Sequence, residues 1–298
     1  MRPNGEIRYL GQSQIDRSLW DRCITNAPNG LIYGHSFYLD HMADHWDALV
    51  LDDYAAVMPL PWRKKWLISY IYQPFLTAQL GLFGADANPE LLGRFLTSIP
   101  KKFRLVECSL NHGNLAAPAG FGLYARTNYV LDLQAPYESL YQNYREQTQR
   151  NIRKSEKYGC TVTKDIDVKK IINLSRIYTG PISINDGKNL EALFQLLKPD
   201  DKAKSYGILS STGELLASCV FFFSHGRAYY ILVGNHPNGR TLGASHALID
   251  AFIRDHARQE LLLDFEGSDL RNLAFFYSSF GAREEPYTAI RINRLPWG

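Results

Sequence analysis

The sequence is poor in the residues that build disulfide frameworks and zinc sites. Its 298 residues include four cysteines, which lie far apart and form no C-x-x-C pair: Cys23, Cys108, Cys160 and Cys219. Small secreted domains need paired cysteines, and structural zinc sites need closely spaced ones, so both classes are excluded. Isolated cysteines suit a reducing compartment, and we expect a cytoplasmic protein.

Apolar runs that could direct the chain to a membrane are also missing. Residues 1–6 contain no apolar stretch of the kind found in signal peptides. Residues 66–84 carry no charge over the length of a membrane span, but they include Gln73, Pro74 and Gly81 and show no helical period. The segment predicts a buried strand followed by a loop, and we expect no membrane span.

The charge balance is nearly even. A net charge of +3 and a pI of about 8.5 argue against a dedicated DNA-binding protein, whose domain would be more basic. With 45% hydrophobic and 21% charged residues, the composition is that of an ordinary globular protein. A chain of this length favours two domains over one.

Several catalytic signatures are absent. The sequence has no G-x-S-x-G elbow, no Walker A loop and no Rossmann fingerprint. His41 and His45 are four residues apart on a predicted helix over residues 32–46, with His35 nearby, but no third ligand follows at a recognisable spacing. We therefore expect no metal site.

The two halves of the chain share an order of predicted elements. Each has two strands, a glycine-containing loop, a helix, and a strand that ends in Glu-x-Ser. In the first half these elements occupy residues 55–58, 67–72, 89–96 and 103–109; in the second half they occupy residues 217–223, 229–233, 245–257 and 262–268. This order predicts a tandem repeat of one α/β unit, with domains at residues 1–134 and 135–298.

A basic stripe lies on the clearest predicted helix, residues 137–158. Arg150, Arg153, Lys154 and Lys157 follow the spacing i, i+3, i+4, i+7, which places them on one face. A solvated helix face explains the stripe, and so does recognition of an anionic ligand such as a nucleotide-sugar diphosphate, coenzyme A or tRNA. Arg150, Arg153 and Lys154 are therefore candidate substrate-binding residues.

The stretch with the most candidate functional residues runs from Tyr229 to Phe280. A strand ends at Gly234-Asn235, a glycine-rich loop follows over residues 236–243, and a helix begins after it. Unpaired N–H groups at a helix start attract anions. The loop resembles the pyrophosphate loop of the GNAT acyltransferases, Arg/Gln-x-x-Gly-x-Gly/Ala, and departs from it at Ser245. It reads Arg240-Thr241-Leu242-Gly243-Ala244-Ser245.

This resemblance implies an acyl-donor site. Gly243 would let the backbone approach the phosphates, the amides of Ala244 and Ser245 would donate to them, and Arg240 would add charge. Asn235, at the end of the strand, completes the candidate donor-binding set. The alternative is that the glycines are turn residues and that Ser245 caps a helix.

Two further residues are candidates for catalysis. Tyr277 stands four residues before Gly281, as does the tyrosine of the last GNAT helix, and the resemblance implies that it protonates the leaving thiolate. A core aromatic on a helix face is the alternative. Glu266, two residues after Asp264 and predicted to share its strand face, is a candidate general base, although a carboxylate at a strand end is often a cap. Tyr229 and His246 are placed as candidate contacts to the substrate.

A second resemblance covers nearly the whole chain. The basic motif Arg145-x4-Arg150-x2-Arg153-Lys154-Ser155 and the segment Phe276-Tyr277-Ser278-Ser279-Phe280-Gly281 are similar to the FemABX family. Its members are two GNAT domains in one chain, and characterised ones transfer an amino acid from aminoacyl-tRNA to a peptidoglycan precursor. Their final motif has Lys where this sequence has Tyr277, which favours the FemAB-like acetyltransferases.

We therefore expect an α/β (α+β) fold of two tandem GNAT-like domains, each a mixed sheet flanked by helices, with the active site in the C-terminal domain. The expected activity is transfer of an acyl group, acetyl from acetyl-CoA, to the amine of a small molecule or peptide. The first domain would be scaffold and acceptor wall. The alternatives are aminoacyl-tRNA-dependent transfer to a cell-wall precursor, with tRNA as partner, and a degenerate GNAT module that binds without chemistry.

Overall fold

The computed structural model describes residues 5–85, 87–118, 120–267 and 269–295. Contacts divide the chain into two compact units: unit 1 is Met1–Thr127 with Glu285–Gly298, and unit 2 is Asn128–Glu284. Strands β7 (Leu123–Asp132) and β13 (Arg283–Asn293) each contain one boundary between the units. A boundary near residue 134 is predicted from the sequence, whereas the return of the C-terminal strand to unit 1 has no counterpart in that prediction.

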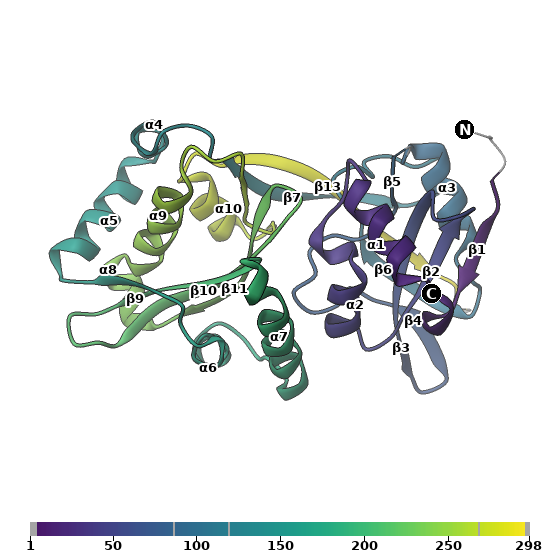
Figure 1. Ribbon diagram of the computed structural model, residues 1–298, viewed down its shortest axis with the longest axis horizontal. Coiled ribbons are helices and arrows are strands. Elements are labelled where there is room, and N and C mark those ends of the chain that lie inside the picture. The colour runs from purple at the N-terminus through teal and green to yellow at the C-terminus, as the bar shows by residue number, and fades with distance from the viewer. Residues whose placement is uncertain (1–4, 86, 119, 268, 296–298) are drawn as a thin grey trace. The chain divides into compact units, whose positions relative to one another are not determined.

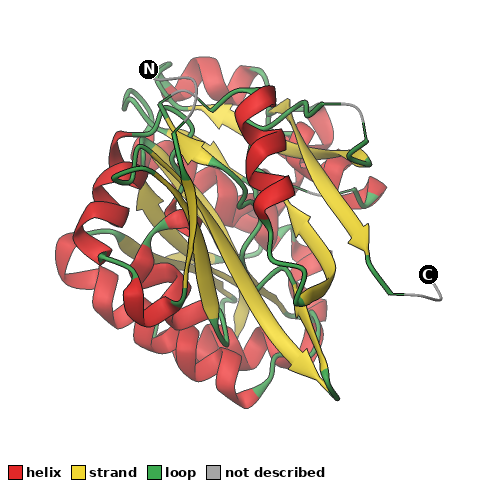
Figure 2. Cartoon of the chain, turned by 90° about the vertical axis from the view of Figure 1, so that its right-hand side faces the viewer, coloured by secondary structure: helices red, strands yellow, loops and turns green. Residues whose placement is uncertain are grey.

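Unit 1 is a mixed sheet with helices against it (Figure 1, Figure 2). Its strands follow the order β1-β2-β3-β4-β6-β13, and β5 pairs with β3; β4 and β6 are parallel. The strands are β1 Ile7–Leu10, β2 Trp46–Leu51, β3 Ala56–Lys65, β4 Ile68–Ile71, β5 Phe83–Gly84 and β6 Phe103–Ser109. The helices are α1 Arg17–Asn26, α2 Ser36–Met42 and α3 Pro89–Ser98, with short 3-10 helices η1 Gln12–Gln14 and η2 Ile32–Gly34.

The strands of unit 2 follow the order β7-β12-β11-β10-β9-β8, in which β11 and β12 are parallel and the other pairs are antiparallel. Its strands are β8 Thr161–Lys164, β9 Ala203–Leu209, β10 Leu215–Ser224, β11 Arg227–Asn235 and β12 Leu262–Asp264. Its helices are α4 Tyr137–Gln142, α5 Glu146–Lys157, α6 Val168–Tyr178, α7 Ile184–Leu197, η3 Lys198–Asp200, α8 Pro237–Leu242, α9 Ala244–His256 and α10 Arg271–Ser278. Helices α5 and α9 lie on one face of this sheet and α6 on the other (Figure 1).

The predicted repeat is present as a shared order of strands. In each unit an antiparallel series leads to a parallel step made through a helix: β4–α3–β6 in unit 1 and β11–α9–β12 in unit 2. The next strand of the chain then pairs outside its own half. Strand β7, which follows β6, pairs with β12, and β13, which follows β12, pairs with β6. The predicted fold class, two mixed sheets flanked by helices, is confirmed.

The burial of the central strands explains why the hydrophobic pattern of the sequence predicts them. In β10 the residues from Leu216 to Phe222 are all buried, as expected of a strand covered on both faces. The edge strand β8 has no buried residue, and β13 lies beyond the last pattern that we recognised; both were missed. Within the described ranges, no helix has the length and apolarity that a bilayer span needs.

The predicted helix over residues 32–46 is shorter than expected. Helix α2 ends at Met42, and Ala43 takes an extended backbone. The chain must leave the helix there because the fully buried Trp46 begins β2 and pairs with Pro61. His41 and His45 therefore do not share a helix face: the His41 ring contacts the carbonyl of Phe37, and the His45 ring stacks on Trp62.

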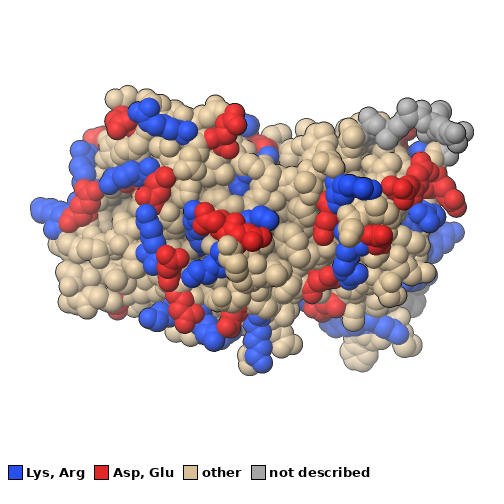
Figure 3. Space-filling model, viewed as in Figure 1, with Lys and Arg blue, Asp and Glu red and all other residues tan. Residues whose placement is uncertain are grey.

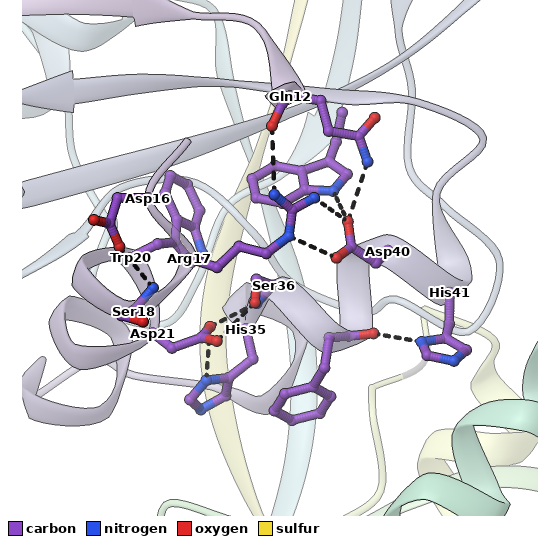
Figure 4. A network of polar contacts seen from close by, with 12 residues as sticks. Gln12, Asp16, Arg17, Ser18, Trp20, Asp21, His35, Ser36, Asp40 and His41 are labelled. Atoms are coloured by element: carbon purple, nitrogen blue, oxygen red, sulfur yellow. Dashed lines mark hydrogen bonds and ion pairs between the residues drawn. The ribbon is translucent and has the colours of Figure 1, made fainter. Parts of the chain in front are cut away.

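Polar side chains connect α1 with α2 (Figure 4). The Asp40 carboxylate receives two hydrogen bonds from the Arg17 guanidinium, at 2.9 and 3.0 Å, one from the indole of Trp46 at 2.8 Å and one from the Gln12 amide at 3.1 Å. Burial raises the pKa of Asp40, but these hydrogen bonds outweigh burial and hold the pKa below its ordinary value. The ionised carboxylate thus stabilises unit 1.

We predict that Asp40→Asn lowers the free energy of unfolding by about 1–2 kcal/mol at pH 7. Because the folded-state pKa is depressed, this contribution exists above the carboxyl pKa of the unfolded chain and disappears as pH falls through the folded-state pKa. Urea unfolding from pH 7 down to acid should show the gap between wild type and variant closing. The matched change Asp44→Asn, at an exposed carboxylate paired with Arg63, should have little effect. A gap that stays constant with pH would contradict the assignment.

Candidate functional site

The two parallel strands of unit 2, β11 and β12, stop pairing before β11 ends. β11 and β12 pair at three positions, from Arg227↔Leu262 to Tyr229↔Asp264. Strand β12 ends there, while β11 continues to Asn235, and among the described strands β10 alone pairs with this last part. The carboxyl ends of parallel strands are where open α/β sheets bind ligands. Residues 230–235 of β11 therefore present backbone N–H and C=O groups toward a place that β12 does not occupy.

A β-bulge interrupts β11 just after this point. The β10–β11 register pairs Val220 with Leu232 and Phe221 with Tyr230, so Ile231 has no residue opposite it. A bulge leaves backbone groups outside the ladder and re-aims them, and bulges are frequent beside active sites. The run Tyr229-Tyr230-Ile231-Leu232 contains no Gly or other turn residue, so the bulge could not be predicted from the sequence pattern.

The turn that follows β12 is held by a buried carboxylate. Asp264 Oδ1 accepts a hydrogen bond from the Glu266 N–H at 2.8 Å and from Asn128 Nδ2 at 2.9 Å, and Asp264 Oδ2 lies 2.9 Å from Arg227 Nη1. Glu266 takes a left-handed backbone with φ of 62°. The prediction that Asp264 and Glu266 share one strand face is wrong, because β12 ends at Asp264 and a turn places Glu266. Ser268, also part of the predicted motif, lies outside the described residues.

Tyr277 lies beside this turn. Its ring on α10 stacks on Phe265 at 4.7 Å and approaches Tyr129 at 6.2 Å, and the side chain is buried. Burial raises the pKa of the Tyr277 phenol, and the negative charge of Glu266 raises it further. The fold thus brings the two predicted catalytic residues together, and the phenol keeps its proton at neutral pH.

The two FemABX-like motifs contact one another. The Arg145 N–H donates to the Ser279 carbonyl at 2.9 Å, Thr148 Oγ1 donates to Ser279 Oγ at 2.8 Å, and the Arg145 guanidinium lies 4.4 Å from the centre of the Phe275 ring. This docking corrects the predicted continuous helix over residues 137–158. Arg145 takes an extended backbone to reach Ser279, so the helix is divided into α4 and α5.

Residues 236–243 do not form an open loop as predicted. They contain α8, and each glycine makes a close approach to the protein's own backbone. A Cβ added to Gly239 would lie 2.4 Å from the carbonyl oxygen of Leu216, and one added to Gly243 would lie 2.3 Å from that of Asn151 on α5. Gly243 also has a φ of 73°. Packing of α8 and α9 therefore requires both glycines, whatever ligand binds nearby.

The start of α9 is tied to the end of β11. Ser245 Oγ donates to Asn235 Oδ1 at 2.8 Å, Ala244 is buried, and Arg240 is exposed on α8. Two predicted donor-site residues, Asn235 and Ser245, are thus in contact. This arrangement sets the N-terminal amides of α9 beside the strand end where β11 has left β12.

His246 faces the interior between α5 and α10. Its ring lies 4.9 Å from Phe276 and 5.9 Å from Phe280, and Asn151 Nδ2 lies 3.3 Å from its Nε2. Burial lowers the pKa of His246 to about 4, so the imidazole is neutral at physiological pH. Tyr229 is fully buried in β11. Both side chains pack within the structure, and their predicted contact with substrate stays a prediction.

The predicted basic stripe is on the surface of α5. Arg150, Arg153 and Lys154 are exposed, and Arg150 forms an ion pair with Glu146 one turn earlier. The opposite side of α5 carries the buried Thr148 and the Asn151 backbone that approaches Gly243. The stripe is therefore available to solvent or to an anionic ligand.

A polar cavity of about 550 Å³ lies at the other end of α9. It is lined by three lysines and three aspartates, with His256, where α9 ends; the charged residues are Lys164, Lys198, Lys204, Asp165, Asp201 and Asp255. Among the residues that the structure describes, no group of three or more His, Cys, Asp or Glu side chains is placed to hold a metal ion. The cavity lies away from Gly243 and is not the predicted donor site.

Unit 1 fills the corresponding place with its own chain. Parallel pairing of β4 and β6 ends at Ile71↔Val106, and beyond it Leu80 bridges Leu110 and donates its N–H to the Ser109 carbonyl at 2.9 Å. Residues 79, 80, 82 and 83 are fully buried. The side chains of Asn29, Asn111 and Asn114 all donate to the Leu82 carbonyl and fix the segment.

Gly243→Ala provides a test of the close approach to α5. Its φ of 73° and the Asn151 carbonyl both oppose a Cβ, whereas Gly226 has a φ of 64° with nothing within 4 Å of an added Cβ. We expect Gly226→Ala to lower the free energy of unfolding by about 1 kcal/mol and Gly243→Ala to cost about 1–3 kcal/mol more. Equal losses in urea unfolding would show that α5 yields without cost.

Comparisons with known proteins agree with this architecture. No family model and no curated protein matches the sequence. Among solved structures, FemX is similar with a TM-score of 0.63 and 12% identity, over 95% of this chain and 96% of that one. The tandem GNAT protein from the clavulanic acid biosynthesis pathway, solved without AcCoA, has a TM-score of 0.57 and 12% identity over 98% and 99%.

L-PGS from Bacillus licheniformis is similar with a TM-score of 0.56 and 11% identity, over 95% of this chain and 92% of that one. Each likeness spans both units and nearly the full length of both chains. At such identities the likeness concerns the fold. The chain therefore has the fold of tandem GNAT proteins such as FemX.

Proposed function

We propose that the protein is an acyltransferase whose unit 2 moves an acyl group, acetyl from acetyl-CoA, to an amine. The observation that carries the proposal is that β11 and β12 stop pairing after Tyr229 and Asp264. A bulge at Ile231 follows in β11, and Glu266 and Tyr277 lie beside the end of β12. The shared fold with FemX and with the tandem GNAT protein supports it.

The donor would lie along the free side of β11. Residues 232–235 have no β12 partner, so their backbone groups can pair with the two amides of an extended pantetheine arm, much as an added strand pairs with a sheet edge. The pyrophosphate would then meet the N-terminal amides of α9, around Ala244 and Ser245, with the exposed Arg240 adding positive charge.

The chemistry would combine placement with two proton transfers. The amine nitrogen attacks the thioester carbonyl, and backbone N–H groups at the Ile231 bulge donate to the developing oxyanion. Glu266 accepts the proton that the amine loses. Carbon–sulfur cleavage follows, and Tyr277 donates its proton to the thiolate. The raised pKa of Tyr277 ensures that the phenol is protonated before the step.

The acceptor class is an amine on a small molecule or a peptide. Unit 1 has no equivalent donor place among its described residues, because residues 79–83 fill it. We assign unit 1 the role of scaffold. Tyr229 is fully buried and His246 is half-buried and neutral beside aromatic rings, so both would support the site from behind.

Calorimetric titration with acetyl-CoA tests the donor assignment. We expect saturable binding, weakened roughly ten-fold by Arg240→Glu through loss of phosphate attraction. Lys188→Glu, at an exposed cation on α7, is the matched control and should bind as wild type does. Absence of saturation at millimolar ligand would reject coenzyme A as the donor.

The catalytic assignments predict that Tyr277→Phe and Glu266→Gln each lower kcat by about 10²-fold or more while leaving acetyl-CoA affinity nearly unchanged. Tyr129→Phe removes a neighbouring phenol that bonds to Glu284 and serves as the control. Acetyl transfer to a panel of amines, followed by release of free thiol, measures turnover. Full activity in Tyr277→Phe would remove the assigned acid, and binding with no turnover in any variant would favour a non-catalytic module.

A second candidate is transfer from aminoacyl-tRNA to a peptide amine. The observation in its favour is that Gly243 faces the Asn151 backbone and Ser245 is engaged with Asn235, which leaves less of the pyrophosphate loop for coenzyme A. The exposed Arg150, Arg153 and Lys154 would then contact the tRNA backbone. If acetyl-CoA fails to bind, salt-sensitive retention of charged tRNA, lost on reversing Arg153 and Lys154, would support this candidate.

A further inference from the structure

The hairpin between β3 and β4 ends in the two most exposed large hydrophobic side chains of the described residues. Trp66 is 87% exposed and Leu67 is 89% exposed, and they are consecutive. Single exposed hydrophobic residues are common, but two bulky ones at the tip of a hairpin expose a contiguous apolar surface to solvent. Neither side chain contributes to the core of unit 1.

The geometry of the turn does not require Trp and Leu at these two positions. Lys65 pairs with Ile68, so Trp66 and Leu67 form a two-residue hairpin loop. Trp66 has a φ of 58°, while Leu67 is not among the residues of positive φ, and a positive φ at the first loop position alone is that of a type II′ turn, which favours Gly there. A bulky residue in this conformation is strained. Folding would be better served by Gly-Ser than by Trp-Leu.

The surroundings of the tip are positively charged. Lys64 and Lys65 are exposed immediately before Trp66. Strand β4 runs parallel to β6 from Ser69↔Phe103, so the exposed Lys101 and Lys102, which precede β6, lie at the same end of the sheet. In the space-filling view, Lys and Arg side chains lie at the lower edge of unit 1, where the hairpin ends (Figure 3).

Acidic groups at this end are already engaged. Asp44 pairs with the Arg63 guanidinium, and Asp47 accepts hydrogen bonds from the Tyr9 hydroxyl and, at 3.5 Å, from Lys102 Nζ. The charges of Lys64, Lys65 and Lys101 are therefore not cancelled by these neighbours. An apolar tip surrounded by cations is complementary to a surface that offers hydrocarbon beneath phosphate groups.

We propose that the β3–β4 hairpin docks unit 1 on an anionic lipid surface. Trp66 and Leu67 would enter the interfacial layer of the bilayer, and Lys64, Lys65 and Lys101 would lie at the lipid phosphates. Tryptophan prefers the membrane interface, and leucine gains from contact with acyl chains. A nucleic acid is the poorer fit, because an aliphatic side chain cannot stack on bases and Leu67 would remain in water.

Vesicle flotation of the full chain tests the proposal. Wild type should float with phosphatidylcholine vesicles that contain phosphatidylserine and remain behind with phosphatidylcholine alone. The double variant Trp66→Gly/Leu67→Ser should bind roughly ten-fold or more weakly, with an unfolding midpoint equal to wild type or higher because the turn is relieved. Ile184→Ser, which removes another exposed hydrophobic side chain of 69% exposure, should float as wild type does.

Charge reversal probes the second half of the proposal. Lys64→Glu/Lys65→Glu should weaken flotation roughly ten-fold or more, and added salt should weaken wild-type binding. Three outcomes would overturn the proposal: wild type that ignores anionic vesicles, the Gly-Ser variant floating as well as wild type, or retention of RNA that depends on the lysines and not on Trp66 and Leu67. Self-association that requires Trp66 and Leu67, without vesicle binding, would assign the tip to a second copy of the chain instead.

Discussion

The Asp264 carboxylate is the constraint on which the site depends. It is buried, it faces the Arg227 guanidinium at the start of β11, and it accepts from the Asn128 amide of β7 and from the Glu266 N–H. One side chain thus joins three adjacent strands at the level where β11 and β12 part. A buried carboxylate without these partners would be costly, so the three strands and the turn at Glu266 are fixed together.

This arrangement explains how one fold uses its two copies differently. In unit 2 the charged contacts at Asp264 hold β12 short and leave the carboxyl end of β11 beside the start of α9. In unit 1 a set of buried asparagine amides holds residues 79–83 in the corresponding place, and the fully buried Leu80 and Leu82 fill it with hydrocarbon. Buried amide networks of this kind rigidify a core. The same strand order therefore leaves the strand end unpaired in one copy and fills the corresponding place with buried chain in the other.

Much of the fold was predictable because its central elements are locally consistent. Residues 216–222 are almost all apolar and form a buried strand, and residues 244–256 follow a glycine and form a helix. In both segments the local sequence pattern predicts the observed backbone conformation. Features set by distant partners were not predictable. The break at Arg145 depends on Ser279, the end of α2 depends on Trp46 in the next strand, and the unpaired Ile231 depends on the register of β10. The sequence motifs identified Glu266 and Tyr277 as candidate catalytic residues. Their proximity in space could not be predicted, because it depends on the turn that the Asp264 carboxylate stabilises.

The exchange of strands between the two halves has a consequence for the order in which the chain can fold. Unit 1 lacks the strand that covers β6 until residues 289–293 have been synthesised, so its sheet is left with an open edge for most of translation. The strands of unit 2, in contrast, are all present once β12 is made, because β7 is synthesised early. The N-terminal half of this protein is therefore the last to be completed, and a ribosome-bound chain would need its edge shielded while it waits.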